Sequence, residues 1–307
     1  MMRMVLRRLA QFPLVLLAVY SATFLLAWAL PGSAVLQDEQ RAPPPEVVAA
    51  MEERYDLHNP WAFYVGYVAR LVTTGDFGPS LRYPDWSVGE IIAGALPVSV
   101  ALGLTAVGMA LVIGVGAGVA GAARPGSAAD VMTLGLALVG ISFPTFVAGA
   151  ALLLVFPVGL GIGRVGGWGR MSDLLLPAFT LSLPFAAYIA RLTRSGMIEA
   201  MRSDYVRTAR AKGVSEAGVL LRHALPNAFL PVLSFLGPAA AGAMTGSFVV
   251  EKIFNVPGIG QHFVSAVLNK DLFLIMGVVL VYATLLLVMN LLVDVLYRFV
   301  DPRIRLD

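Results

Sequence analysis

Six long apolar stretches constrain what this chain can fold into more than any other feature of its sequence. Each has roughly the 20 mostly apolar residues that a helix needs to cross the hydrocarbon core of a bilayer. They are, approximately, Leu9–Leu30, Leu96–Ala122, Val131–Val155, Leu174–Leu192, Ala228–Val250 and Leu272–Phe299. Of the 307 residues, 58% are hydrophobic and only 13% are charged, whereas a soluble domain carries about a quarter charged residues. The sequence therefore predicts an all-α integral membrane protein with six transmembrane helices.

The positions of Lys and Arg predict which side of the membrane each loop faces, because basic residues accumulate on the cytoplasmic side. With the N-terminus inside, eight of the 22 basic residues fall on the outer side and the other 14 on the inner side. The outer eight are Arg41, Arg54, Arg70, Arg82, Arg164, Arg170, Lys252 and Lys270. An even number of spans also places the C-terminus inside, so both termini are predicted to be cytoplasmic.

The spans divide the chain into three predicted segments. Residues 1–30 hold the N-terminal tail and the first transmembrane helix, 31–95 form a long extracytoplasmic loop, and 96–307 form a five-helix core. Helix-start signals in the outer loop predict two short helices, about Glu46–Tyr55 and Trp61–Val72. Either this loop is a solvated cap on the helix bundle or it is a docking surface for a partner outside the membrane.

Glycine and proline interrupt the apolar spans. Gly114 and Gly118 in the second span have the GxxxG spacing that lets helix backbones approach closely. Five prolines fall in spans three to five, at Pro144, Pro177, Pro184, Pro231 and Pro238. Two interpretations stay open: a tightly packed bundle with kinks, or helices that bend around a pathway.

The inner segment 193–225, between spans four and five, is much longer than a turn requires. Good helix formers run from Met197 to Lys212, Gly213 stops that helix, and Ser215 can cap a second one. The six basic residues of the segment alone are ordinary for a cytoplasmic loop. Two helices joined by a glycine turn, however, predict a rigid hairpin on the inner face, which is what a mechanical coupling element needs.

The same inner segment resembles the cytoplasmic loop of the permease subunits of bacterial ATP-binding-cassette (ABC) importers. That loop has a Glu-Ala-Ala, Gly, Leu-Pro signature, whose matching positions here are Ala209, Gly213, Leu225 and Pro226. Arg207 and Thr208 stand where the signature has its Glu and its first Ala. The stretch from Tyr205 to Gly213 is instead similar to the variant found in the dipeptide, oligopeptide and nickel branch.

The resemblance to this branch extends over nearly the whole chain. The other similar pieces, in order, are Arg7-Arg8, Leu30–Gly32, Gly75–Gly78 with Ser80-Leu81, Val250–Phe254, Pro257–Gly260, Asn290–Asp294 and Asp301–Arg305. The pieces before residue 82 are similar to the first of two paired permeases. The second type usually carries a Gly-Thr-Asp-x-x-Gly-Arg-Asp segment, which is absent from this sequence.

The resemblance implies a type I ABC importer (MetI-like) permease fold, in the bacterial cytoplasmic (inner) membrane, with a cytoplasmic coupling helix between spans four and five. It implies a second permease subunit, two cytosolic ATPase subunits and an extracytoplasmic solute-binding protein as partners, besides membrane lipid. It also implies that the helix near Tyr205–Glu216 docks into a groove on an ATPase subunit. The implied coupling residues are Tyr205, Arg207, Thr208, Ala209, Arg210, Ala211, Lys212, Gly213, Ser215, Glu216, Leu225 and Pro226.

The function implied is half of a translocation pathway that works by alternating access. Di- and oligopeptides are the expected cargo, and a nickel chelate, glutathione or a sugar are the alternatives within the same machine. Small or adaptable residues of span five are candidates for lining the pathway: Gly242, Met244, Thr245 and Ser247. The same residues are equally typical of close helix packing.

The sequence predicts neither a catalytic residue nor a metal site. It has no Cys, three widely separated His, and no lysine that follows a glycine, so it has no Gly-Lys-Ser/Thr phosphate loop. ATP and Mg²⁺ are expected on the partner ATPase subunits, with no cofactor on this chain and no nucleic acid as a partner. A secondary transporter or channel is the competing class, but such proteins usually have internal repeats or charged residues at membrane depth, and we find no internal repeat and no mid-membrane carboxylate pair.

Overall fold

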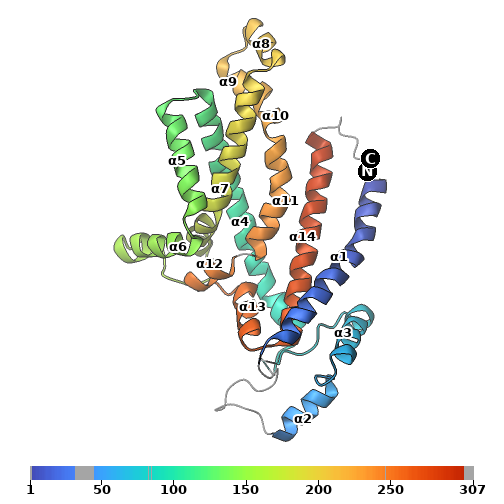
Figure 1. Cartoon of the computed structure of the whole chain (residues 1–307). Helices are drawn as coiled ribbons and strands as arrows, with labels where there is room; N and C mark the ends of the chain where they lie inside the picture. The colour runs from blue at the N-terminus through green and yellow to red at the C-terminus, as the bar shows by residue number, and fades with distance from the viewer. Residues whose placement is uncertain (1, 32–44, 82, 84, 246, 301–307) are drawn as a thin grey trace. The chain divides into compact units, whose positions relative to one another are not determined.

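The structure, a computed structural model, describes residues 2–31, 45–81, 83, 85–245 and 247–300, and this part of the chain consists of helices and loops without a β-strand (Figure 1). The helices are α1 (Met2–Ala29), α2 (Pro45–Arg54), α3 (Pro60–Thr74), α4 (Val88–Ala123), α5 (Ala128–Ser142), α6 (Thr145–Leu153), α7 (Met171–Met201), α8 (Asp204–Ala211), α9 (Glu216–Gly218), α10 (Leu225–Ala228), α11 (Leu230–Thr245), α12 (Phe248–Ile253), α13 (Ile259–Leu268) and α14 (Leu272–Val300). Two π-helical turns, η1 (Leu154–Gly159) and η2 (Val219–Ala224), continue α6 and α9. The expected all-α class is confirmed.

Five segments of the described chain are helical, long and apolar enough to cross a membrane. They are Val5–Ala29, Val88–Ala123, Met171–Met201, Leu230–Ile253 and Leu272–Leu296. They coincide with the first, second, fourth, fifth and sixth predicted spans. The fourth runs well past its expected end at Leu192, because helix formers continue to Met201.

The third predicted span, Val131–Val155, is wrong as a single helix. α5 ends at Ser142, and α6 with η1 begins at Thr145 after a bend of 102°. The cause is Pro144, whose ring disfavours the helical conformation for the residue before it. Phe143 is accordingly extended, with φ −78° and ψ 125°. The six-span count holds when this bent pair is taken as one span.

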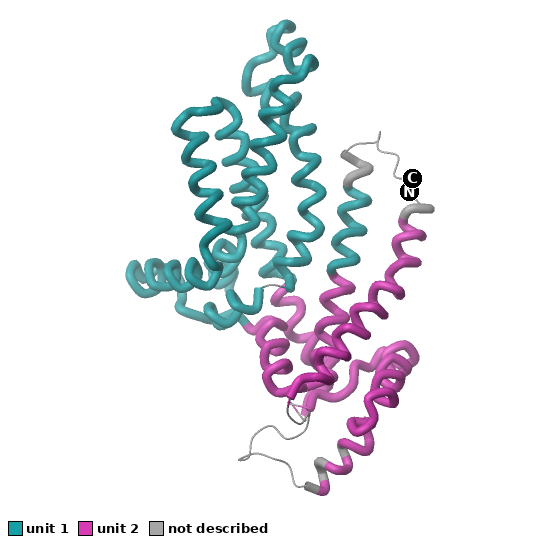
Figure 2. The backbone as a smooth tube through the Cα atoms, in the orientation of Figure 1, with its two compact units in different colours: residues 1–4, 100–256, 286–307 teal, residues 5–99, 257–285 magenta. Residues whose placement is uncertain are grey.

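The chain divides into two compact units, each assembled from separate parts of the sequence (Figure 2). Unit 1 comprises residues 1–4, 100–256 and 286–307, and unit 2 comprises 5–99 and 257–285. The inner segment and the candidate pathway residues all belong to unit 1. Unit 2 contains most of α1 together with α2 and α3.

Aromatic side chains join α1 to α3 in unit 2. The rings of Tyr20 and Tyr67 stack with their centroids 5.6 Å apart, and those of Phe24 and Phe63 stack at 6.1 Å. All four side chains are buried. Asn59 caps the start of α3, because its side-chain oxygen accepts hydrogen bonds from the next two free backbone N–H groups, at 3.1 and 3.2 Å. The two short helices predicted before residue 75 therefore form, and α3 is packed against α1.

A second set of contacts in unit 2 holds the segment between α3 and α4. The buried Ser80 donates a hydrogen bond from Oγ to Oδ2 of Asp271, at 2.6 Å, and Asp271 is fully buried just before α14. Ser99 Oγ accepts a hydrogen bond from the backbone N–H of Ile259 at 2.9 Å. These buried polar groups are satisfied by one another, as burial requires.

In unit 1, α4 approaches the backbone of α7 closely at the two glycines of the GxxxG pair. A Cβ placed on Gly114 would lie 2.7 Å from the carbonyl oxygen of Ala186, and one on Gly118 would lie 2.6 Å from Cβ of Thr193. Real Cβ atoms do not approach other atoms so closely, so both positions require glycine. The predicted close helix approach at this pair is confirmed.

Two further helices of unit 1 also meet α7 at glycines. On α5, a Cβ at Gly140 would lie 3.0 Å from Cβ of Ala187. On α7 itself, a Cβ at Gly196 would lie 2.9 Å from the carbonyl oxygen of Ala228 in α10. α7 is thus the helix against which α4, α5 and α10 pack in unit 1.

Candidate coupling site

The inner segment of unit 1 is a compact helical projection beyond the end of α7 (Figure 1). The expected continuous helix from Met197 to Lys212 is wrong, because α7 ends at Met201 and α8 begins at Asp204. Ser203 is extended between them, and its Oγ donates to the carbonyl oxygen of Ala200 at 2.5 Å. Such local serine bonds compete with helical ones and favour a helix boundary. We call the residues from Ser203 to Glu216 the coupling segment.

The predicted stop at Gly213 is confirmed. Its φ is +78°, in the left-handed region that glycine adopts readily. The backbone N–H of Gly213 donates to the carbonyl of Arg210 at 2.9 Å, and that of Val214 donates to the carbonyl of Ala209 at 3.2 Å. Glycine is therefore needed here for its backbone conformation, since no atom lies within 4 Å of the place where a Cβ would stand.

Ser215 caps the returning helix, as expected from the sequence. Its Oγ accepts a hydrogen bond from the backbone N–H of Gly218 at 3.3 Å. From there α9, η2 and α10 follow one another with helical backbone at the junctions Val219 and Leu225. The coupling segment is thus joined to α7 at one end and, through η2 and α10, to α11 at the other.

A small apolar core attaches α8 to the returning helix. Val206, Ala209 and Val219 are buried in it, and Met201 and Val214 pack against them. The remaining side chains of α8 face outward. The exposed residues of this face are Asp204, Tyr205, Arg207, Thr208, Arg210 and Ala211.

Two polar contacts link α8 to the residues that follow the Gly213 turn. Arg210 donates to both carboxylate oxygens of Glu216, at 2.9 and 3.2 Å, across the Gly213 turn. The side-chain amide of Asn227 donates to the hydroxyl of Tyr205 at 2.9 Å. Through these two contacts α8 is tied to the returning helix at both of its ends.

The ion pair across the turn also sets the ionisation of its members. The hydrogen bond from Arg210 lowers the pKa of Glu216 below its ordinary value. The same bond raises the pKa of Arg210. Both side chains are therefore charged over the physiological pH range.

The structure places the predicted coupling residues in one region. Tyr205, Arg207, Thr208, Arg210, Ala211, Lys212, Gly213, Ser215 and Glu216 are exposed on the projection. Ala209 is buried beneath α8, so it supports the segment and presents no surface to a partner. Leu225 and Pro226 lie in α10, at the base of the projection. Their role in coupling stays a prediction.

The four candidate pathway residues lie around the end of α11. Met244 is buried against Gly103 of α4, where an added Cβ would be 2.8 Å from Met244 Cα. Ser247 is buried and its Oγ donates to Oε1 of Glu251. Gly242 and Thr245 are half-buried. A pathway role for these positions stays a prediction, and two of them serve packing within this chain.

Sequence reasoning missed two residues, Asp130 and Asn227, and the ion-pair role of a third, Arg194. Asp130 of α5 forms an ion pair with Arg194 of α7, which had been counted only as one of the inner basic residues. Asn227 holds the coupling segment through Tyr205. The signal for Asp130 was present in the sequence, because Ser127 followed three residues later by an acid is typical of a helix start.

Comparison with known proteins agrees with this architecture. The family described as "binding-protein-dependent transport system inner membrane component" matches residues 91–306. The chain belongs to this family. It is therefore a permease component, as the resemblance of its inner segment had predicted, and a multi-pass protein of the inner membrane.

Two groups of relatives resemble this permease over its full length. The oligopeptide transport system permease proteins of Escherichia coli K12 and Haemophilus influenzae are 41% and 40% identical to it, over 99% of this chain and 100% of each relative. The dipeptide transport system permease protein of Bacillus subtilis is 38% identical over 100% of this chain and 99% of the relative. The likeness therefore includes the outer loop and α1 as well as the part that the family model matches.

Proposed function

We propose that this permease forms half of the translocation pathway of an ABC importer that takes up di- and oligopeptides. The observation that carries the proposal is the full-length similarity to permeases named for oligopeptide and dipeptide transport. The alternative cargoes, a nickel chelate, glutathione or a sugar, have no such support among these relatives. A secondary transporter is not favoured either, since the family is that of binding-protein-dependent systems.

The proposed partners follow from the same family. A second permease completes the pathway, two cytosolic ATPase subunits supply energy, and an extracytoplasmic solute-binding protein delivers the peptide. ATP and Mg²⁺ bind to the ATPase subunits. Both termini of this chain and the coupling segment are then cytoplasmic, which agrees with the 14 basic residues on that side.

The coupling segment is proposed as the contact with an ATPase subunit. Its exposed face carries Arg207, Thr208 and Lys212, while its buried face is anchored on the returning helix. A segment anchored by an apolar core and two polar contacts moves as a body when it is pushed. It therefore transfers movement to α7 and α11, to which its two ends lead.

Alternating access is the proposed mechanism. Closing of the ATPase pair on ATP would move the coupling segment and open the pathway toward the binding protein, and hydrolysis would reverse the movement. Such a switch between dominant states requires ATP to favour one of them by about 5 kcal/mol. The energy is released in the ATPase subunits and reaches the pathway only through contacts such as the coupling segment.

Reconstitution tests the proposal. The permease, its partner permease and the two ATPase subunits are placed in liposomes with the binding protein and ATP, and uptake of radiolabelled di- to pentapeptides is measured. We expect ATP-dependent uptake that requires the binding protein and that an excess of unlabelled peptide competes away. A matched preparation with an ATPase subunit that cannot hydrolyse ATP serves as the control. Uptake of a nickel chelate, glutathione or a sugar without peptide uptake would overturn the peptide assignment.

A further inference from the structure

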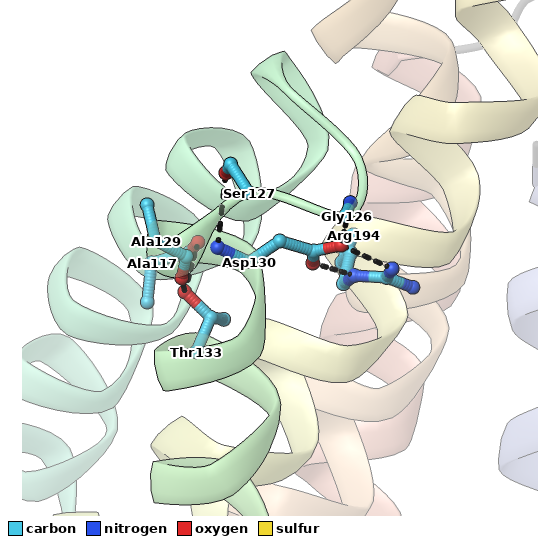
Figure 3. A network of polar contacts seen from close by, with 7 residues as sticks. All are labelled: Ala117, Gly126, Ser127, Ala129, Asp130, Thr133 and Arg194. Carbon is cyan, nitrogen blue, oxygen red and sulfur yellow. Dashed lines mark hydrogen bonds and ion pairs between the residues drawn. The ribbon is translucent and has the colours of Figure 1, made fainter.

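An ion pair joins α5 to α7 at the end of unit 1 that carries the coupling segment (Figure 3). Asp130 is the third residue of α5, and its backbone N–H donates to Oγ of Ser127, the N-cap residue, at 3.4 Å. Its Oδ2 accepts a hydrogen bond from the backbone N–H of Gly126 at 2.8 Å. The carboxylate is thus held in place by the turn that precedes its own helix.

Arg194 of α7 donates to both oxygens of this carboxylate. Nε donates to Oδ1 of Asp130, and Nη2 donates to Oδ2 at 2.8 Å. Asp130 is 3% exposed, and the side chain of Arg194 is 22% exposed. Two-pronged Arg–carboxylate pairs are stronger and more directional than single contacts. Because the pair is largely buried, removing one partner leaves a charge without compensation.

The α7 end of this contact is linked to the coupling segment by the last two turns of α7 and by a packed apolar core. Arg194 precedes Met201, the last residue of α7, by two turns of the same unbroken helix. Between them, Met197 and Ala200 are buried together with Ala224 and Ala228, which belong to η2 and α10. The returning helix that follows the coupling segment is thus packed directly on the part of α7 that carries Arg194.

The α5 end of this contact also packs closely on α7, as the approach of Gly140 to Ala187 shows, and it is hydrogen-bonded to α4. Thr133 Oγ1 donates to the carbonyl of Ala117 in α4 at 3.3 Å. Residues of α4, α5 and α7 also line an apolar groove of about 590 Å³, which extends to Phe143 and Phe179. α5 then ends at the bend before Pro144. Among the described contacts of α5 with α7, the Asp130–Arg194 pair is the one between full charges.

We propose that the Asp130–Arg194 pair is a clasp that makes α5 follow α7 when the coupling segment moves. Arg194 is then a positioning residue for opening of the pathway, although it lies outside the predicted coupling residues. This inference rests on the proposed function, because it assigns a part of the same movement. A purely structural pair would stabilise the fold without changing how ATP hydrolysis is linked to uptake.

The test uses the reconstituted importer and three changes at the clasp. Arg194→Ala removes the guanidinium and both of its hydrogen bonds to Asp130. Arg194→Lys keeps the positive charge but cannot form the bidentate contact. The double change Asp130→Asn with Arg194→Gln removes both charges and leaves groups that can still hydrogen-bond to each other. Arg191→Ala is the matched control. Arg191 lies on the same helix, is exposed, and its guanidinium carbon is 5.0 Å from the ring centroid of Tyr188.

The decisive measurement is the number of ATP molecules hydrolysed per peptide imported by the assembled complex. We expect this ratio to rise at least about fivefold in Arg194→Ala. A factor of about five is the smallest effect that two coupled sites in a protein typically have on each other. Arg194→Lys should give a smaller rise, and Arg191→Ala should leave the ratio unchanged. Quantities of assembled complex and its melting temperature are measured in parallel, since a structural role alone would change these and not the ratio.

Every outcome of this measurement either supports or overturns the clasp. An unchanged ratio in assembled Arg194→Ala complex overturns the clasp. If Arg194→Ala does not assemble, the ratio is measured in Arg194→Lys and in the double variant Asp130→Asn with Arg194→Gln. Unchanged ratios in these two variants overturn the clasp. Failure of all three variants to assemble would show that the pair is purely structural. Absence of peptide uptake by the wild-type complex would instead contradict the proposed function, so the two failures are distinguishable.

Discussion

Gly118 of α4 lies directly against Thr193 of α7, so that a Cβ on the glycine would stand 2.6 Å from Cβ of the threonine. Thr193 is fully buried, and it immediately precedes Arg194 of the clasp. The close approach of α4 and the ion pair to α5 thus occur at the same level of α7. Three helices of unit 1 are fixed to one another there, about two turns before the end of α7.

Adding a methyl group at this contact should destabilise the protein. Gly118→Ala forces α4 away from α7, and overpacking of this kind typically costs about 1–3 kcal/mol. Gly116→Ala is the matched control, because no atom lies within 4 Å of the place for its Cβ on the same helix. Thermal unfolding of the purified permease in detergent measures the difference. Equal melting temperatures for the two variants would contradict the tight contact.

Replacing Gly213 should affect coupling beyond its effect on stability. Gly213→Ala places an alanine at φ +78°, which costs roughly 1 kcal/mol because left-handed backbone crowds the Cβ. Gly75→Ala carries the same kind of strain at φ +69°, also with no atom within 4 Å of its Cβ. We expect similar losses of thermal stability in both.

The two glycine variants should differ in transport. Only Gly213→Ala is expected to lower peptide uptake per assembled complex and to weaken binding of the ATPase subunits, because only Gly213 lies in the coupling segment. Uptake measured in liposomes and ATPase-subunit binding measured by pull-down check this. A Gly75→Ala variant that loses as much uptake as Gly213→Ala would indicate a general effect of strain.

The hydrogen bond between Asn227 and Tyr205 should contribute to the rigidity of the coupling segment. A net contribution of about 0.5 kcal/mol is expected, at the low end for hydrogen bonds because both side chains are exposed. Tyr205→Phe, Asn227→Ala and the double variant form a double-mutant cycle for the affinity of the ATPase subunit. The sum of the two single losses in binding free energy should exceed the loss measured for the double variant, because both single changes remove the same bond. Strict additivity would show that the bond is absent in the assembled importer.

The Arg210–Glu216 pair should give the coupling segment a stability that depends on pH. Because Arg210 lowers the pKa of Glu216, the folded state holds the charged carboxylate more strongly than the unfolded state does. The stabilisation is therefore full above the unfolded pKa of Glu216, near the ordinary glutamate value of 4.5, and is lost as the pH falls through the lower folded pKa.

Glu216→Gln isolates this contribution. The melting temperature of wild-type permease should exceed that of the variant at neutral pH, and the two should converge when the pH falls below the folded pKa of Glu216. Glu199→Gln, at the end of α7 and outside the turn, is the comparison variant for the loss of one carboxylate. A wild-type advantage that grows on acidification would contradict the assigned direction.

Several features of this permease were readable from the sequence because they depend on local or bulk properties. Apolar length alone predicted that five of the spans exist and roughly where they lie, although two of them are longer than expected. The left-handed Gly213 and the cap at Ser215 follow from the backbone freedom of glycine and the hydrogen bonding of serine, which are properties of single residues. The close contact at Gly118 follows from its spacing with Gly114 on one helix face.

Other features were decided only by the tertiary structure. Whether a proline is accommodated or breaks a helix depends on its surroundings: α7 continues through Pro177 and Pro184, whereas the chain turns by 102° at Pro144. The partners of Asp130 and Asn227 lie 64 and 22 residues away along the chain, so no local pattern links them. The sequence by itself thus determined five of the six spans, the turn of the coupling segment and the family. Which helices contact that segment and one another was determined by long-range packing and one ion pair, because these depend on where distant parts of the chain meet.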